Sequence, residues 1–150
     1  MKAMKLRFTS LASLCGAIAL FFTSCGSMDA KKPVLKNTKW VCIQKMFVAD
    51  AGTSTETFTI EFTSAKECTY TMSWFLPSHP AMYVNPDGTI DTVPASHSES
   101  VEKGTWAYRR GKVTLTMEDG GTKVFSYKDD KLISDTPGLD GNLMVFEKQD

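Results

Sequence analysis

The chain has 150 residues, of which 42% are hydrophobic and 23% are charged, and its 17 basic residues balance its 17 acidic ones. This composition is typical of one globular domain with a hydrophobic core. It argues against nucleic acid as a partner, because the basic pairs Lys31-Lys32 and Arg109-Arg110 stand apart and form no basic stretch.

The first 24 residues have the layout of an export signal. Three basic residues come first: Lys2, Lys5 and Arg7. An apolar run over 11–22 follows and ends in small residues. A basic start, an apolar segment of about 7–15 residues and a small-residue cleavage site describe a secretory signal peptide. The apolar run is shorter than the ~20 residues that a membrane-spanning helix needs.

The end of this signal resembles the lipobox of bacterial lipoproteins, in which a small residue precedes a cysteine that is lipidated. Ser24 and Cys25 match that pattern, whereas Phe22 stands where Leu or Val is usual. The resemblance implies that residues 1–24 are removed and that Cys25 carries lipid, including palmitate. It places the protein in the bacterial cell envelope, anchored to a bilayer in the periplasm or at the surface. The alternative is an ordinary cleaved signal followed by an incidental cysteine.

Residues 25–36 are polar and show no periodicity, which predicts a lipidated tether before a folded domain over 37–150. Removing the signal takes away three basic residues and no acidic ones. The mature chain then has 14 basic and 17 acidic residues, a formal charge of −3.

Alternation of apolar and polar residues with a period of two begins at Trp40. It is clearest over 57–63 and 68–74, as in antiparallel strands with one face on a core. Further strands are predicted over 98–108, 113–117, 122–128, 132–133 and 143–147. No segment of the mature chain has helical periodicity. Short strands joined by tight turns predict an all-β fold, a small antiparallel up-and-down β-barrel of about eight strands.

Residues 77–96 interrupt the alternation. They hold four prolines, the turn sequence Asn85-Pro86-Asp87-Gly88 and His79. We expect a long loop here, with a short strand pair around 82–84 and 89–93. Long loops in compact domains are often functional. The apolar residues of 74–83 make this loop either a surface for a protein partner or a lid over the barrel mouth.

Short motifs at Asn37-Thr38-Lys39-Trp40, at 104–108 and at 143–148 resemble the small lipocalin-like domains of bacterial lipoproteins. The resemblance implies a calycin-type barrel that holds a small hydrophobic ligand, with Trp40 closing one end. No glycine stands at the place that the lipocalin Gly-x-Trp signature gives it. Six aromatic residues are candidates to line a ligand cavity: Phe58, Phe62, Tyr70, Trp74, Trp106 and Tyr108. The alternative is that these side chains fill the core.

Cys42 and Cys68 are the two cysteines that follow the predicted tether. An oxidising envelope favours a disulfide between them, and the alternative is a pair of buried free thiols. The histidines, His79 and His97, are either solvated or part of a surface metal site with Asp87 or Asp91. Neither their spacing nor that of the cysteines matches a ligand motif, so no metal site is predicted.

The chain has no nucleophile elbow, phosphate-binding loop or zinc-protease helix, so we expect a non-enzymatic protein without a cofactor. Two functions remain open for the mature domain. One is binding of a small hydrophobic ligand inside the barrel. The other is a protein–protein interaction or structural role in the envelope, as an inhibitor or assembly factor acting through the 77–96 loop.

Overall fold

The structure is a computed structural model that describes residues 32–150. The predicted signal peptide, Cys25 and most of the predicted tether lie outside the described residues. The described part consists of strands, turns and bends, with no helix. Within it, no helix meets the length and hydropathy needed to cross a membrane.

Eight strands close into one antiparallel barrel in the order β1-β10-β9-β8-β7-β6-β3-β2. The barrel strands are β1 (Thr38–Val48), β2 (Gly52–Phe62), β3 (Glu67–Leu76), β6 (Ser96–Arg109), β7 (Lys112–Met117), β8 (Thr122–Lys128), β9 (Lys131–Pro137) and β10 (Leu143–Gln149). Two short strands, β4 (His79–Pro80) and β5 (Thr92–Val93), form a separate pair between β3 and β6. This arrangement confirms the predicted all-β up-and-down barrel, and it is consistent with a calycin-like fold.

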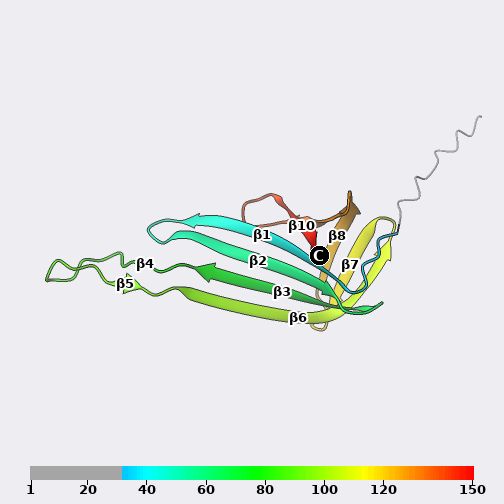
Figure 1. The fold of residues 1–150 in the computed structure, drawn as a ribbon, viewed down its shortest axis with the longest axis horizontal. Coiled ribbons are helices and arrows are strands. Elements are labelled where there is room, and N and C mark those ends of the chain that lie inside the picture. The colour runs from blue at the N-terminus through cyan, green and yellow to red at the C-terminus, as the bar shows by residue number, and fades with distance from the viewer. Residues whose placement is uncertain (1–31) are drawn as a thin grey trace, which may run out of the picture. The chain divides into compact units, whose positions relative to one another are not determined.

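The barrel strands differ in length, and the excess of the long ones leaves the barrel. β1 pairs with β2 over all 11 of its residues, whereas β10 pairs with β1 only at 39–41. β6 pairs with β3 over 96–105, whereas β7 pairs with β6 only over 104–109. Figure 1 shows β1, β2, β3 and β6 running together away from the other strands. We call residues 43–56 and 72–102 the arm.

The core lies where all eight strands surround it. The largest fully buried side chains include Trp40, Phe62, Phe125, Phe146, Ile60, Leu115 and Leu132. Aromatic rings meet edge to face inside it, as in the 5.3 Å contact between the ring centroids of Phe125 and Phe146. Leu35 is also fully buried in this cluster, so packing begins inside the segment predicted as a tether.

The strand pair expected around 82–84 is wrong in position. The paired segments are β4 and β5, in the register His79 with Val93 and Pro80 with Thr92. Residues 82–84 lie beyond this pair, at the approach to a turn closed by a hydrogen bond from Asn85 N to Thr89 O. The 77–96 segment is therefore the end of one long hairpin.

The disulfide between Cys42 and Cys68 is not formed, and both cysteines are free and buried. Cys42 lies on β1 opposite Phe58, and Cys68 lies on β3 two residues beyond the Ile60–Tyr70 pair, so β2 stands between them. Neighbouring strands are about 4.8 Å apart, and a disulfide needs Cα atoms within about 7 Å. The alternative of two buried thiols is the one the structure contains.

Candidate functional site: the projecting arm

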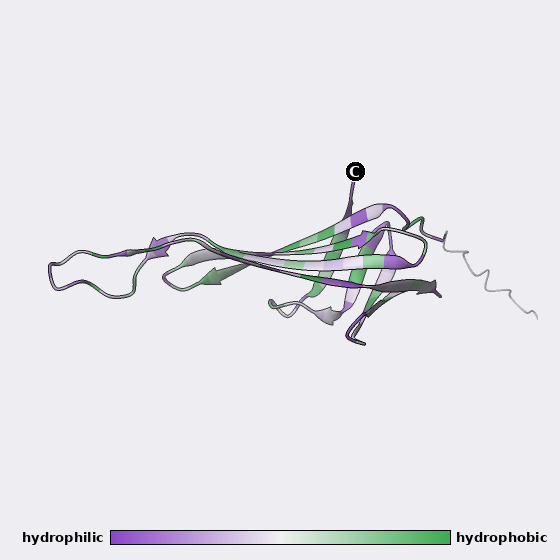
Figure 2. Ribbon diagram, turned by 90° about the horizontal axis from the view of Figure 1, so that it is seen from below, coloured by the Kyte–Doolittle hydropathy of each residue, from purple (hydrophilic) through white to green (hydrophobic). Residues whose placement is uncertain are grey.

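The arm differs from the barrel because no second sheet covers either of its faces. Figure 2 shows it as a narrow twisted ribbon with stretches of hydrophobic residues, coloured green, beyond the barrel. By register, Ile43, Phe47 and Phe75 lie on one face, and all three are exposed, Phe47 by 77%. The opposite face, which continues the core side of the barrel, exposes Met46 and Met72. Exposed apolar side chains gathered on one feature mark an interaction surface.

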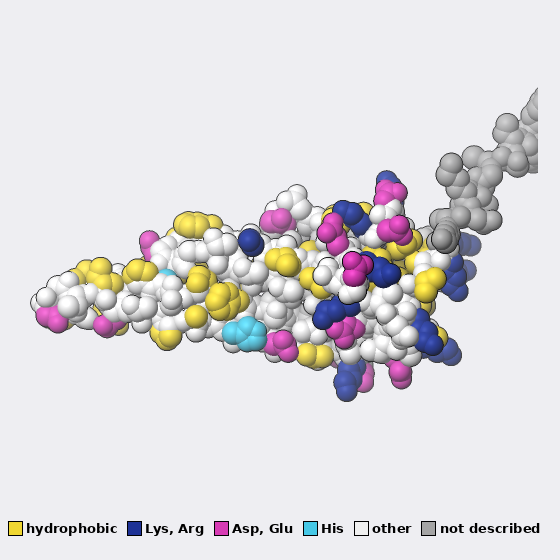
Figure 3. Space-filling model, viewed as in Figure 1, with side chains coloured by type: hydrophobic (Ala, Val, Ile, Leu, Met, Phe, Trp, Pro, Cys, Tyr) yellow, Lys and Arg dark blue, Asp and Glu magenta, His cyan; other side chains and the backbone are white. Residues whose placement is uncertain are grey.

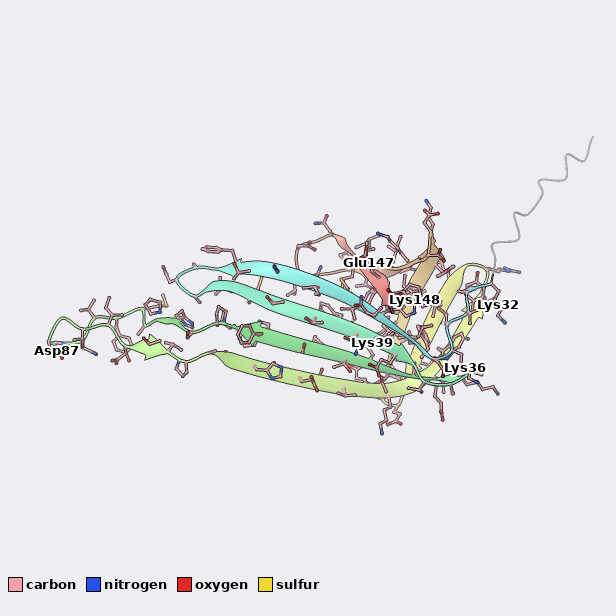
Figure 4. All side chains as sticks on the ribbon, viewed as in Figure 1. Lys32, Lys36, Lys39, Asp87, Glu147 and Lys148 are labelled. Carbon is pink, nitrogen blue, oxygen red and sulfur yellow. The ribbon has the colours of Figure 1, made fainter. Side chains whose placement is uncertain are left out.

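The tip of the arm exposes a second apolar group. Met82 is 84% exposed, and Tyr83, Val84 and Ile90 are each more than half exposed. These side chains flank the turn at Asp87, which Figure 4 places at the end of the domain away from Lys32 and Lys36. A partner approaching that end would therefore meet apolar side chains first.

Hydrogen bonds hold the tip in one shape. Asp87 accepts from the backbone N–H of Thr89 at 2.9 Å and from its hydroxyl at 2.6 Å. Asn85 Nδ2 donates to Thr89 Oγ1 at 3.0 Å and to Asp91 Oδ1 at 3.1 Å. The bonds from Thr89, first that of its side chain, hold the pKa of Asp87 below its ordinary value. The exposed apolar residues thus sit on an ordered turn, which lowers the entropy that a partner must remove on binding.

One edge of the arm is open. Over 96–102, β6 has β3 on one side and no strand of the described chain on the other. The alternation of antiparallel pairing leaves the backbone groups of His97, Glu99 and Val101 on that open edge. Charged side chains at such an edge discourage pairing between sheets.

The charge of the arm is strongly negative. Residues 72–102 contain four acidic residues and no lysine or arginine, a formal charge of −4. The 43–56 hairpin adds two acidic residues and Lys45 alone. Figure 3 shows most dark-blue side chains on the barrel, whereas the arm carries yellow and magenta ones. The surface is therefore both apolar and acidic.

The structure brings five of the six predicted cavity residues together, but as core. Phe58, Phe62 and Tyr70 are buried, and Trp106 and Tyr108 pack against the same cluster. Trp106 meets Phe62 edge to face at 5.2 Å and donates from Nε1 to Ser64 O at 3.1 Å. Trp74 lies apart from them, half-buried on the arm part of β3.

An open hollow of about 580 Å³ lies against β3, β6 and β7. None of the six aromatic residues borders it. Its lining comes from strand and turn residues: Thr63, Glu67, Thr69, Lys103, Thr105, Thr116 and Glu118, with Cys68, Gly104 and Met117. The surface that these residues turn to the hollow is more apolar than polar, but none of it is aromatic, so the hollow is not the cavity that the six aromatic residues were predicted to line.

The two cysteine thiols of residues 32–150 lie buried among core residues. Burial in the core raises the pKa of Cys68 to about 11 and also raises that of Cys42. Both thiols therefore stay protonated and unreactive near neutral pH. Over the same residues, no three His, Cys, Asp or Glu side chains gather as a metal site.

Comparison of the chain with protein-family models, with curated proteins and with solved structures finds no match. Sequence reasoning selected the apolar segment 74–83 but missed Ile43, Phe47 and Val101. Their exposure depends on how far β1 and β6 extend beyond the shorter strands β10 and β7. No local sequence pattern predicts the length of that extension.

Proposed function

We propose that this protein is a non-enzymatic, lipid-anchored module of the bacterial cell envelope that presents its arm to a protein partner. One observation carries the proposal: the β1–β2 and β3–β6 hairpins extend beyond the barrel and expose apolar side chains from β1 to the tip. A purely structural barrel does not need such an extension, since its core is complete without it.

The charge of the arm defines the kind of partner. A surface with exposed apolar residues and almost no basic ones suits a protein patch that is apolar at its centre and carries Lys or Arg at its rim. The barrel serves as the rigid base, and Cys25 supplies the anchor. Binding of a small hydrophobic ligand in the barrel has less support, because aromatic side chains fill the space that such a ligand needs.

The proposal is tested by photo-crosslinking in intact cells that make the full-length protein. A crosslinking amino acid at Tyr83, on the tip, is compared with one at Lys128, on the barrel. We expect a discrete crosslinked protein from position 83 only. No product from position 83, or the same product from both positions, contradicts the proposal. A crosslinked pair of copies of this chain contradicts the assignment of a different partner.

Charge reversal gives the matched control. Asp91→Lys with Glu99→Lys changes the arm by four charges, and Asp129→Lys with Asp150→Lys makes the same change on the barrel. The arm pair is expected to reduce the crosslinked product at least tenfold, and the barrel pair to leave it within about twofold. Equal effects would mean that net charge, rather than the arm, controls capture.

A further inference from the structure

An up-and-down barrel separates its turns into two sets, one at each end. At one end lie the start of β1, the β2–β3, β6–β7 and β8–β9 turns, and the end of β10. At the other end lie the β1–β2, β7–β8 and β9–β10 turns and the long β3–β6 hairpin. We call the first set the basic end and define it as residues 32–39, 61–67, 108–112, 128–131 and 147–150.

The two ends carry opposite charge. The basic end has ten basic and six acidic side chains. Of the opposite set, residues 43–56, 72–102 and 137–143 have one basic and seven acidic side chains. The β7–β8 turn is left out of this count because Glu118 borders the same hollow as Glu67 of the basic end. The chain's near-neutral total therefore hides a strong polarity along the barrel, with the arm at the negative side.

Several lysines of the basic end have no acidic partner among the described residues. Two of the six acidic groups there pair with other lysines of the same end, since Glu61 pairs with Lys39 at 2.9 Å and Glu147 pairs with Lys131 at 2.8 Å. No ion pair within residues 32–150 involves Lys36, Lys66 or Lys148, and all three are exposed. Figure 4 shows Lys32, Lys36, Lys39 and Lys148 on the barrel part of the domain, remote from Asp87. These lysines are available to an anionic surface.

The start of the packed domain belongs to this same end. Leu35 is buried in the core, so the chain between Cys25 and Lys32 is all that can separate lipid from barrel. Seven residue steps span at most about 25 Å. The field of an anionic leaflet decays over about 10 Å, so such a tether leaves the basic end within reach of it.

We propose that the basic end rests on an anionic phospholipid surface, so that the acidic arm points away from the bilayer. The orientation rests on the lipid anchor of the proposed function, whereas the attraction to the bilayer does not. The anionic surface attracts the basic end and repels the acidic arm, and both forces favour the same orientation of the domain. The tip residues Met82 and Tyr83 are then presented to partners, not to lipid.

The test uses the chain from Cys25 to Asp150 with Cys25→Ser, which cannot be lipidated and keeps the complete core. It is sedimented with vesicles of phosphatidylcholine alone, or of phosphatidylcholine mixed with phosphatidylglycerol. We expect binding to the mixed vesicles only, with release by added salt. Each exposed lysine at an anionic leaflet increases partitioning about fivefold, so Lys36→Gln, Lys66→Gln and Lys148→Gln together should lower it roughly a hundredfold.

The matched control removes three lysines outside the basic end: Lys45→Gln, Lys103→Gln and Lys123→Gln. It makes the same change in net charge and is expected to keep wild-type binding within a few-fold. Equal losses in the two triple variants, or equal binding to both kinds of vesicle, would overturn the proposal. Capture of double-stranded DNA without binding to the mixed vesicles would also overturn it. This measurement depends neither on the lipid anchor at Cys25 nor on the arm. A protein that does not bind the mixed vesicles would therefore leave the crosslinking result at Tyr83 valid.

Discussion

β1, β2, β3 and β6 contribute to both the barrel and the arm, but their apolar residues are buried in the barrel and exposed in the arm. In the barrel, β1, β2, β3 and β6 are completed by four shorter strands, and their inward side chains reach nearly complete burial. In the arm, the same strands continue without these neighbours. The β9–β10 loop covers Gln44 on the inner face and Ser54 is buried, whereas Phe47, Phe75 and the tip face solvent. This difference shows that the number of neighbouring strands, more than the composition of a strand, decides whether its apolar residues are buried and stabilise the fold or are exposed to solvent.

The arm's apolar residues are therefore not explained by folding. Phe47 and Phe125 are the same residue type on strands of one sheet, but the first is 77% exposed and the second is 2% exposed. Burial of a phenylalanine removes its apolar surface from water, and an exposed one contributes little of that free energy.

The largest difference in the free energy of unfolding should come from replacing each of these two phenylalanines by alanine. Phe125→Ala leaves a cavity beside Phe146 and should lower the free energy of unfolding by about 3–5 kcal/mol. Phe47→Ala should change it by less than about 0.5 kcal/mol. Urea unfolding followed by circular dichroism measures both. Comparable losses would mean that the arm is part of the cooperative core, and the comparison would fail.

The boundary between the two regions is at Gly104, where β7 begins to pair with β6. A Cβ at this position would overlap Thr116 O and lie 3.0 Å from Met117 Cα, both of them backbone atoms that cannot rotate away. Gly104→Ala should therefore cost about 1–3 kcal/mol in the same urea experiment.

Gly121→Ala is the control for this substitution. The Cβ added there meets the side chain of Asp119, which can move, so the expected cost is below about 1 kcal/mol. If the two variants were equally stable, the close approach of β6 and β7 at Gly104 would not fix the point at which the arm leaves the barrel.

The sequence predicted the barrel well because one face of each barrel strand is buried. Phe58, Ile60 and Phe62 alternate with threonine and glutamate, and this pattern states both the strand and its inward face. Burial of Leu35 could not be predicted, since Val34 and Leu35 stand side by side in an otherwise polar segment and set no period.

The arm and the cysteines could not be predicted for a different reason. Where β3 and β6 pair beyond the barrel depends on contacts between residues about 20–30 positions apart in the chain. The predicted disulfide is wrong for the same reason. The alternating pattern indicates that Cys42 and Cys68 both face inward, but the distance between them depends on the register of β1, β2 and β3. The turn at Asn85-Pro86-Asp87-Gly88 was predicted from its residues and is closed by Asn85, Asp87 and Thr89, whereas the position of the strand pair beside it was not.

The smallest expected effect is a loss of stability at alkaline pH, which depends on the buried interior of the barrel and not on the arm. Burial raises the pKa of Cys68 from 9.0 to about 11, so the unfolded chain loses this proton first as the pH rises. Its contribution to stability is complete below pH 9 and is lost progressively between pH 9 and 11. At pH 10 the free energy of unfolding should be on the order of 1 kcal/mol lower than at pH 7.

Urea unfolding at pH 7, 8, 9 and 10 measures this slope, and stopping at pH 10 limits the contribution of Tyr70, whose pKa is raised to about 12. Cys68→Ala should remove the part of the loss between pH 9 and 10 that this thiol contributes, whatever its own stability at pH 7, and leave the part that comes from Cys42, whose pKa burial also raises. Phe47→Ala, on the solvent-exposed arm, should leave the slope unchanged. A wild-type curve that stays flat to pH 10 would show that water reaches Cys68, and the barrel interior would then be less closed than its packing indicates.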